Sequence, residues 1–254
     1  MIGRLALKTL SSVVAVSLLA GCASYFEIPI ETPIKPKLDV TPFQRVLIAG
    51  FISGGTEDVD GNVETTRLLR SQLRTKSGLR VIDADVLPLV AAANDAKDAG
   101  TARPADAKEP EIKDDKDLEP LEHLFADVDY WKKIGEEYQN PLIVTGTVMF
   151  TPQTRSGFVQ REVEQFDSFG RRRVVPVRTF QERKGYRLKP KFVFIDGRTG
   201  TTLYSETFSE EVLYNANQST PALSSYFELM DRLIPSFLNT LSSQKVKGAR
   251  VLLQ

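Results

Sequence analysis

Cysteine and histidine are nearly absent from this chain of 254 residues, which has one of each. One cysteine excludes a disulfide within the chain, so stability has to come from packing. One histidine cannot form a structural zinc site, which takes four Cys or His ligands. An excess of charge is also missing, because Lys plus Arg and Asp plus Glu number 33 each. No global field therefore draws the chain to nucleic acid or to anionic lipid.

Long apolar runs are lacking too, apart from one stretch near the N-terminus that is too short to span a bilayer as a helix. Arg4 and Lys8 precede this stretch, and small residues follow it. A charged start, an apolar centre and a small-residue cleavage site are the marks of a secretory signal. The sequence thus predicts an exported protein whose residues 1–21 are removed.

The end of this signal, Leu19-Ala20-Gly21-Cys22, resembles the lipobox of the bacterial lipoprotein family. The resemblance implies lipidation of the Cys22 thiol, with acyl chains such as palmitate as the membrane anchor. In that family an aspartate after the cysteine retains the protein at the inner membrane, and this chain has Ala23 there. The resemblance therefore implies the outer membrane. The domain is expected to face the periplasm, with exposure at the cell surface as the alternative.

The remaining chain divides by composition. Residues 22–43 contain four prolines and little periodicity, which predicts an extended tether after the lipidated cysteine. Residues 44–254 are expected to form one globular domain. Within it, residues 94–120 are acidic and poor in large apolar groups, which predicts a mobile insertion.

Apolar patterns predict the elements of the domain. A continuous apolar run over 45–51 indicates a strand buried on both faces, and a helix over 63–76 and a strand over 79–83 complete a βαβ unit. A helical stripe over 121–134 and a strand over 141–150 follow. Next come a hairpin or meander at 155–193, with its last strand over 188–195, and a hairpin partner over 201–208. A last helix follows and ends at 241, and Pro235 should kink or divide it. The order β-α-β-α-β-β-β-α predicts a mixed α/β fold, with helices packed on a mixed sheet in two or three layers.

This order, together with three short motifs, resembles a group of envelope proteins. The motifs are a first strand ending at Phe51, the strand 142–147 ending in Gly146-Thr147, and a hairpin with Ile195-Asp196 and Thr199-Gly200. The group comprises the N-terminal domain of TolB, the curli secretion lipoprotein CsgG and the peptidoglycan-synthase activator LpoB. The resemblance spans roughly residues 45–92 and 121–241. It implies a fold and gives no functional residue to carry over.

The candidate motifs for catalysis or ligand binding have the wrong spacing. Gly50, Gly54 and Gly55 match neither nucleotide-binding glycine pattern. His123 has no nucleophile motif to serve, and we expect it to be exposed near a helix start. One polar run alternates like calcium ligands but lacks the glycine and glutamate of an EF-hand: Asp58, Asp60, Asn62 and Glu64. We expect no enzyme, no metal and no cofactor, although paired carboxylates leave glycosidase chemistry open.

Charge is segregated along the chain. Residues 155–191 hold eleven Lys or Arg against four Asp or Glu, and residues 95–137 hold seven against fourteen. The basic segment contains a cluster of arginines and phenylalanines, a combination found at protein interface anchors: Phe166, Phe169, Arg171, Arg172 and Arg173. These five are the candidate partner-binding residues, and a solvated hairpin with no specific role is the alternative.

Two functions remain. The first is a lipid-anchored periplasmic interaction module that helps to assemble or regulate an envelope machine by binding a protein partner. The second is a self-assembling lipoprotein of a secretion or envelope complex, a ring like that of CsgG. A pore is disfavoured because the run 158–164 has too few apolar positions on either face. The end of the chain, 249–254, is apolar and is expected to pack on its own domain, with an edge strand or a docking peptide as alternatives.

Overall fold

The computed structural model describes residues 25–97, 112–215, 218 and 220–253. The predicted signal peptide (1–21) and Cys22 lie outside these residues. The chain forms two compact units. Strands β1 (Tyr25–Ile34) and β8 (Gln244–Leu253) belong to the first, and the second is Pro36–Ser242.

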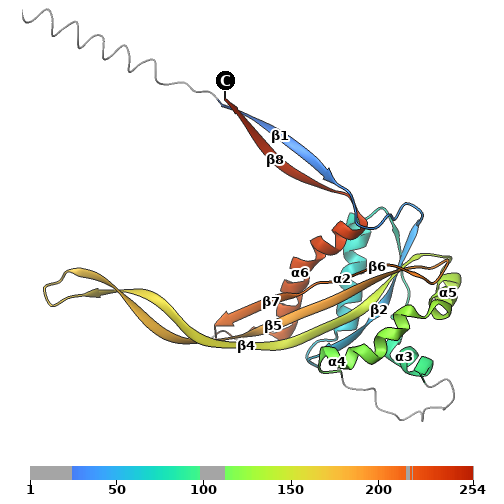
Figure 1. Cartoon of the computed structure of the whole chain (residues 1–254), viewed down its shortest axis with the longest axis horizontal. Helices are drawn as coiled ribbons and strands as arrows, with labels where there is room; N and C mark the ends of the chain where they lie inside the picture. Colours follow the sequence, from blue (N-terminus) through green and yellow to red (C-terminus); the bar gives the residue numbers. More distant parts are fainter. Residues whose placement is uncertain (1–24, 98–111, 216–217, 219, 254) are drawn as a thin grey trace, which may run out of the picture. The chain divides into compact units, whose positions relative to one another are not determined.

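The second unit carries the mixed α/β fold that the sequence predicts (Figure 1). Its strands are β2 (Arg45–Gly55), β3 (Arg80–Ile82), β4 (Leu142–Phe166), β5 (Arg172–Asp196), β6 (Thr202–Thr207) and β7 (Glu210–Asn215). Its helices are α2 (Gly61–Lys76), α3 (Leu89–Lys97), α4 (Asp115–Leu118), α5 (Val128–Glu137) and α6 (Ala222–Leu241), with the 3-10 helix η1 (Glu119–Ala126) between α4 and α5.

The six strands form one mixed sheet in the order β3-β2-β4-β5-β6, with β7 also paired to β5. β2 is parallel to β3 and to β4, whereas β4 and β5 are antiparallel neighbours over their whole length. β6 and β7 occupy the same edge of β5 in turn, β6 along Lys191–Ile195 and β7 along Arg183–Leu188. The predicted parallel βαβ unit is β2-α2-β3.

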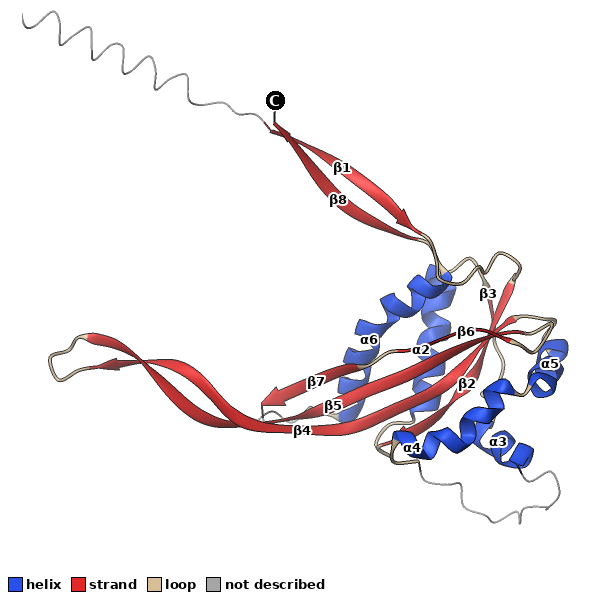
Figure 2. Ribbon diagram, in the orientation of Figure 1, coloured by secondary structure: helices blue, strands red, loops and turns tan. Residues whose placement is uncertain are grey.

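Helices cover both faces of the sheet, which makes the unit three-layered (Figure 2). Val46 and Ile48 of β2 pack with the core that contains α2 and α6, while Leu47 and Ala49 pack with α3, η1 and α5. Successive side chains of a strand point to opposite faces. Burial on both faces explains why this strand is apolar without alternation.

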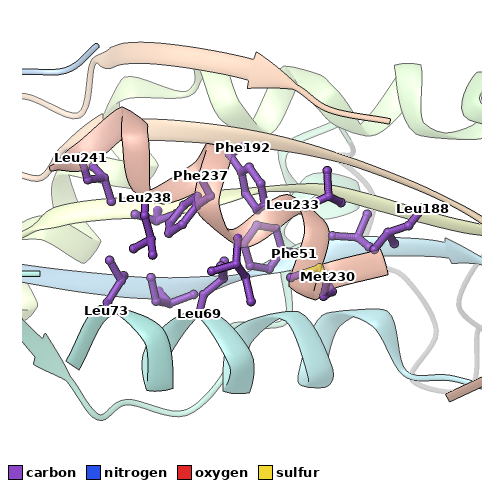
Figure 3. Close-up of a cluster of buried hydrophobic side chains, with 14 of the residues drawn as sticks. Phe51, Leu69, Leu73, Leu188, Phe192, Met230, Leu233, Phe237, Leu238 and Leu241 are labelled. Carbon is purple, nitrogen blue, oxygen red and sulfur yellow. The ribbon is translucent and has the colours of Figure 1, made fainter. Parts of the chain in front are cut away.

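The core between α2, α6 and the sheet is rich in aromatic rings (Figure 3). Phe192 of β5 packs against Phe51 of β2, with ring centroids 5.9 Å apart, and against Phe237 of α6 at 4.8 Å. The buried Tyr226 hydroxyl donates to the Gly61 carbonyl at 3.1 Å and also contacts the Thr65 hydroxyl. Burial in this core raises the pKa of Tyr226 well above its ordinary value. These contacts join α2 and α6 to the central strands.

The first unit is a two-stranded antiparallel ribbon of β1 and β8. Tyr25 lies opposite Leu253 and Ile34 lies opposite Gln244. The expected single-chain tether (22–43) therefore contains a paired strand, and Leu38 and Phe43 at its end are buried in the core of the second unit. At about 3.3 Å per residue a ten-residue ribbon is roughly 33 Å long. The expected packing of 249–254 on their own domain is wrong, because residues 249–253 pair with β1 in this ribbon, which is closer to the alternative of an added strand.

The expected mobile insertion (94–120) is bounded by regular structure. Its first residues belong to α3, and residues 98–111 lie outside those described. Beyond them Ile112 is buried and accepts a backbone hydrogen bond from Gly55 at 2.8 Å, and Leu118 of α4 is buried as well. The part of the segment from Ile112 onward thus packs against the sheet.

Two expected helices differ in detail. The stripe at 121–134 forms η1 and α5, which are separated at Asp127, and the Asp127 carboxylate caps α5 by accepting from the Tyr130 N–H. Pro235 neither divides nor ends α6, which continues from residue 222 to residue 241. Pro235 is on the exposed side of the helix while Ile234 and Phe237 are buried, so packing holds the helix together where a backbone hydrogen bond is lost.

Candidate functional site

The predicted basic hairpin is a two-stranded arm. β4 and β5 pair continuously from Leu142 and Asp196 to Phe166 and Arg172. Their described sheet neighbours stop earlier, because β2 ends opposite Phe150 and β7 ends opposite Arg183. We define the arm as residues 155–166 and 172–183 with the connecting turn 167–171. It is drawn in Figure 1 as the pair of strands that continues past the rest of the sheet.

The arm exposes large apolar side chains on a segment rich in charge. Phe158 and Phe180 lie opposite each other, are 69% and 59% exposed, and pack edge to face with centroids 5.5 Å apart. The Arg178 guanidinium lies 5.9 Å from the Phe158 ring. Exposed aromatic rings next to arginines are the composition of interface anchors.

The end of the arm is an ordered turn organised by Asp167. The Asp167 carboxylate accepts from the backbone N–H groups of Phe169 and Arg171, both at 2.9 Å, and from Arg171 Nε at 3.1 Å. Gly170 follows in the left-handed region with φ 73°, which the turn requires. The turn thereby orders the backbone that carries the side chains on either side of it.

The structure brings the five predicted residues together at this end, which we call the tip: Phe166, Phe169, Arg171, Arg172 and Arg173. Phe166 and Phe169 are 71% and 80% exposed. The Arg171 guanidinium lies 5.4 Å from the Phe169 ring, and Arg172 pairs with Glu164 of β4. Arg173 is exposed and opposite Gln165. The tip thus combines two open rings with a cluster of guanidinium groups.

The Asp167 carboxyl has a lowered pKa. The largest cause is the hydrogen bond from the Arg171 backbone, to which those from the Phe169 backbone and the Arg171 side chain add. These donors favour the ionised form, because each one binds the carboxylate more strongly than the acid. The turn is therefore held most firmly when Asp167 is charged.

The base of the arm is anchored by Glu211 of β7. Its carboxylate accepts from Arg155 at 3.0 Å and from Arg187 at 3.2 Å, on two different strands. Lys189 and Lys191 of β5 pair likewise with Asp115 and Glu122 near α4. Acidic groups from outside the segment thus offset part of the basic charge counted in the sequence.

Sequence reasoning did not select Phe158, Phe180, Asp167 or Glu211. The sequence does contain a signal for the first three. Asp167 and Gly170 are typical turn residues, and residues equally far from a hairpin turn, such as Phe158 and Phe180, become neighbours across the two strands. Glu211 lies 56 residues from Arg155, so only the tertiary fold shows their pairing.

The rejected candidate motifs have structural roles, although Gly50, Gly54 and Gly55 lie within strand β2 and not in a loop after it. The Asp60 carboxylate caps α2 by accepting from the Val63 N–H, and Asn62 accepts from the Phe51 N–H at 2.7 Å. Gly54 and Gly55 belong to the end of β2 and contact Ile112 and Phe150. His123 is exposed in η1, where its Nδ1 lies 2.8 Å from the Pro120 carbonyl oxygen.

Polar grooves on the second unit are lined by side chains that pair with each other. A cavity of about 520 Å³ lies beside α4 and contains the ion pair of Lys189 with Asp115. A smaller one of about 250 Å³ beside it contains Lys191 with Glu122, 2.8 Å apart. Over the described ranges, no group of three or more His, Cys, Asp or Glu side chains could hold a metal ion. No helix in that part of the chain is both long and apolar enough to cross a membrane.

Comparison with known proteins gives similarities of structure only. No family model matches the sequence, and no curated protein matches it. Lipoprotein GNA1162 from Neisseria meningitidis aligns over 77% of this chain and 98% of its own, with 13% identity and a TM-score of 0.34. A neuraminyllactose-binding hemagglutinin homolog from Helicobacter pylori aligns over 81% of this chain and 86% of its own, with 10% identity and a TM-score of 0.31.

Proposed function

We propose that this chain is a lipid-anchored interaction module of the bacterial envelope that binds a protein partner through the tip of its arm. The lipobox at Cys22 supports the anchor, and Ala23 after it supports the outer membrane. We place the domain in the periplasm, with the cell exterior as the alternative. The module acts without catalysis, and its role is to help assemble or regulate the machine that it contacts.

One observation carries the proposal. Phe166 and Phe169 are 71% and 80% exposed beside Arg171, on a turn that Asp167 holds in place. Fixed aromatic and arginine side chains lose little conformational entropy on binding, and such residues dominate interface energies. An ordered tip of this composition fits a pocket with apolar walls and an acidic rim on the partner.

The test is photo-crosslinking in cells with the full-length lipoprotein. A photoreactive amino acid replaces Phe169, and captured proteins are identified by mass spectrometry. We expect one dominant foreign protein. Reversing the tip charge with Arg171→Glu, Arg172→Glu and Arg173→Glu should abolish its capture, since the acidic rim would then face like charges.

The matched control reverses exposed charges elsewhere, Lys132→Glu with Lys133→Glu on α5, and should leave the capture unchanged. Circular dichroism of all variants checks that the domain stays folded. Capture that survives the tip reversal would contradict the proposal. A ladder of self-crosslinked copies, with no foreign protein, would favour the alternative, a self-assembling lipoprotein.

A further inference from the structure

The outer edge of β4 in the arm has no strand beside it among the described residues. β2 pairs with β4 only as far as Phe150. Beyond this point β4 continues to Phe166 with β5 on its other side alone. A two-stranded hairpin is marginally stable in water unless further strands or a packed face support it. An open strand edge is also a template for pairing with another chain.

Prolines show which backbone groups point toward this edge. Alternate residues of an antiparallel strand direct N–H and C=O away from the partner strand, and a proline, which has no N–H, fits only at those positions. Pro152, Pro176 and Pro190 lie in pairs of even-numbered residues along the unbroken β4–β5 register. Two backbone bonds agree: the Phe150 carbonyl accepts from Thr56 at 2.8 Å, and the Pro190 carbonyl accepts from Phe208 at 2.9 Å. In both strands, the backbone N–H and C=O groups of the even-numbered residues thus point away from the other strand of the arm.

The two edges of the arm are therefore unequal. The outward positions of β4 run from Thr154 to Phe166 without a proline. Those of β5 are interrupted in the middle by Pro176, opposite Glu162. A proline on an exposed edge prevents a further strand from completing its ladder. The β4 edge is the one that can accept a strand along its full length.

We propose that this edge pairs with the same edge of a second copy of the chain, antiparallel and with its two-fold axis at Gln160. This inference goes beyond the proposed function, because it names a second surface and does not depend on the tip binding a partner. The pairing converts two two-stranded arms into one four-stranded sheet.

The charge order of β4 favours this arrangement. Pairing about Gln160 places each charged residue of β4 opposite an uncharged one of the second copy. The pairs are Arg155 with Gln165, Arg161 with Val159, Glu162 with Phe158, and Glu164 with Ser156. Parallel pairing in register would place each arginine and glutamate opposite itself, and like charges directly opposite destabilise a sheet.

The length of the arm favours the same register. Pairing about Gln160 brings Phe166 of one copy opposite Thr154 of the other. This position is short of Phe150, where β2 already occupies the edge. Each arm then covers the open edge of the other. Across the four strands, Phe180 and Phe158 of one copy are followed by Glu162 and Pro176 of the second copy, and these four side chains lie on the same face.

Cysteine scanning of the full-length protein, in the membrane or in detergent, tests the register. Gln160→Cys should form a disulfide dimer, because a residue on the axis meets its own copy. Ser156→Cys and Glu164→Cys should dimerise when expressed together and poorly when expressed alone. The parent chain with Cys22 as its sole cysteine gives the background. Equal yields at every position, as parallel or random encounters would give, overturn the proposal, and so does the absence of dimers.

Proline variants test the role of the backbone. Gln160→Pro removes an outward N–H of β4 and leaves the β4–β5 ladder intact, so the dimer should be lost in chemical crosslinking and sedimentation. Arg178→Pro is the matched control, because residue 178 lies opposite residue 160 on the edge that Pro176 already interrupts. A dimer that survives Gln160→Pro overturns the proposal. Photo-crosslinking of the foreign partner at position 169 is measured in the same variants. Loss of the dimer is thereby distinguished from loss of partner binding at the tip.

Discussion

At the scale of single residues, the tip depends on the charge of one carboxyl group. Asp167 binds two backbone N–H groups and the side chain of Arg171, and no other residue links both ends of the turn in this way. Replacing Arg172 or Arg173, whose side chains do not bind Asp167, removes a surface charge, whereas neutralising Asp167 releases the turn that positions both phenylalanines. The two kinds of variant therefore separate recognition from preorganisation.

The lowered pKa of Asp167 gives a pH dependence. In the folded turn the pKa of Asp167 is below its ordinary value of 3.8. The ionised carboxylate therefore stabilises the turn fully above pH 3.8, and this stabilisation is lost as pH falls through the lowered pKa. The Phe169 and Arg171 amide resonances should shift in NMR with a midpoint below 3.8. Asp167→Asn should abolish this titration while the core remains folded. A midpoint at or above 3.8 would show that the backbone donors do not hold the carboxylate.

At the scale of elements, β4 combines a buried half and an exposed half with different tolerances. Gly146 is in the buried half with φ 144°, and a Cβ there would lie 1.8 Å from the Lys191 carbonyl oxygen of β5. Gly157 is in the arm, where a Cβ would meet nothing within 4 Å. The same glycine-to-alanine change thus probes the close approach of two strands in one case and open space in the other.

Gly146→Ala should lower the free energy of unfolding by more than about 2 kcal/mol, because alanine is strained at positive φ and the strands would have to separate. Gly157→Ala should change it by less than about 0.5 kcal/mol, as surface substitutions usually do. Urea denaturation followed by circular dichroism measures both. Similar values for the two variants would mean that β4 and β5 do not pack as closely at Gly146 as the structure has them.

The buried elements were predictable and the ribbon was not. The runs at 45–51 and 141–150 gave the central strands, since strands covered on both faces are apolar throughout. The prolines of β1 favoured an extended tether. Pro29 and Pro33 are four residues apart, however, so both face the same edge of β1 and leave its ladder with β8 free to form. Nothing local in either segment indicates the other as its partner.

The residues of the tip could be predicted from the sequence, whereas the contacts that support the base of the arm could not. Clustered arginines and phenylalanines at 166–173 were visible in the sequence, and the structure places them on one turn. The base of the arm depends on Glu211, from a strand that sequence patterns did not predict, because β7 is only six residues long and only partly buried. Whether the tip binds a partner stays a prediction that the crosslinking experiment tests.

At the scale of the whole molecule, the core residues and the ribbon belong to different units of the chain. Every core residue of the described chain belongs to the second unit, Pro36–Ser242. The hydrophobic core of the described residues thus consists of side chains of the second unit.

Deleting residues 243–254 should leave the thermal midpoint of the second unit within about 2 °C of its original value, because no core contact is removed. The same deletion should increase amide hydrogen exchange in β1, which loses its partner strand. Differential scanning calorimetry and hydrogen exchange measure the two effects. A large fall in the midpoint would show that the ribbon stabilises the core. Deleting a buried element such as α6 is the contrasting control and should unfold the unit.

The ribbon also sets an order of events during synthesis. β1 is made before the elements of the second unit and β8 after them, so the contacts between β1 and β8 have the largest sequence separation among the described strand pairs. Pairings of high contact order form late, because the intervening chain must first become compact. Until then Ile28, Ile30 and Ile34 belong to an unpaired segment that proteases can reach. The ribbon therefore closes only after β8 has been made, and a copy terminated before Gln244 would keep that segment open to degradation.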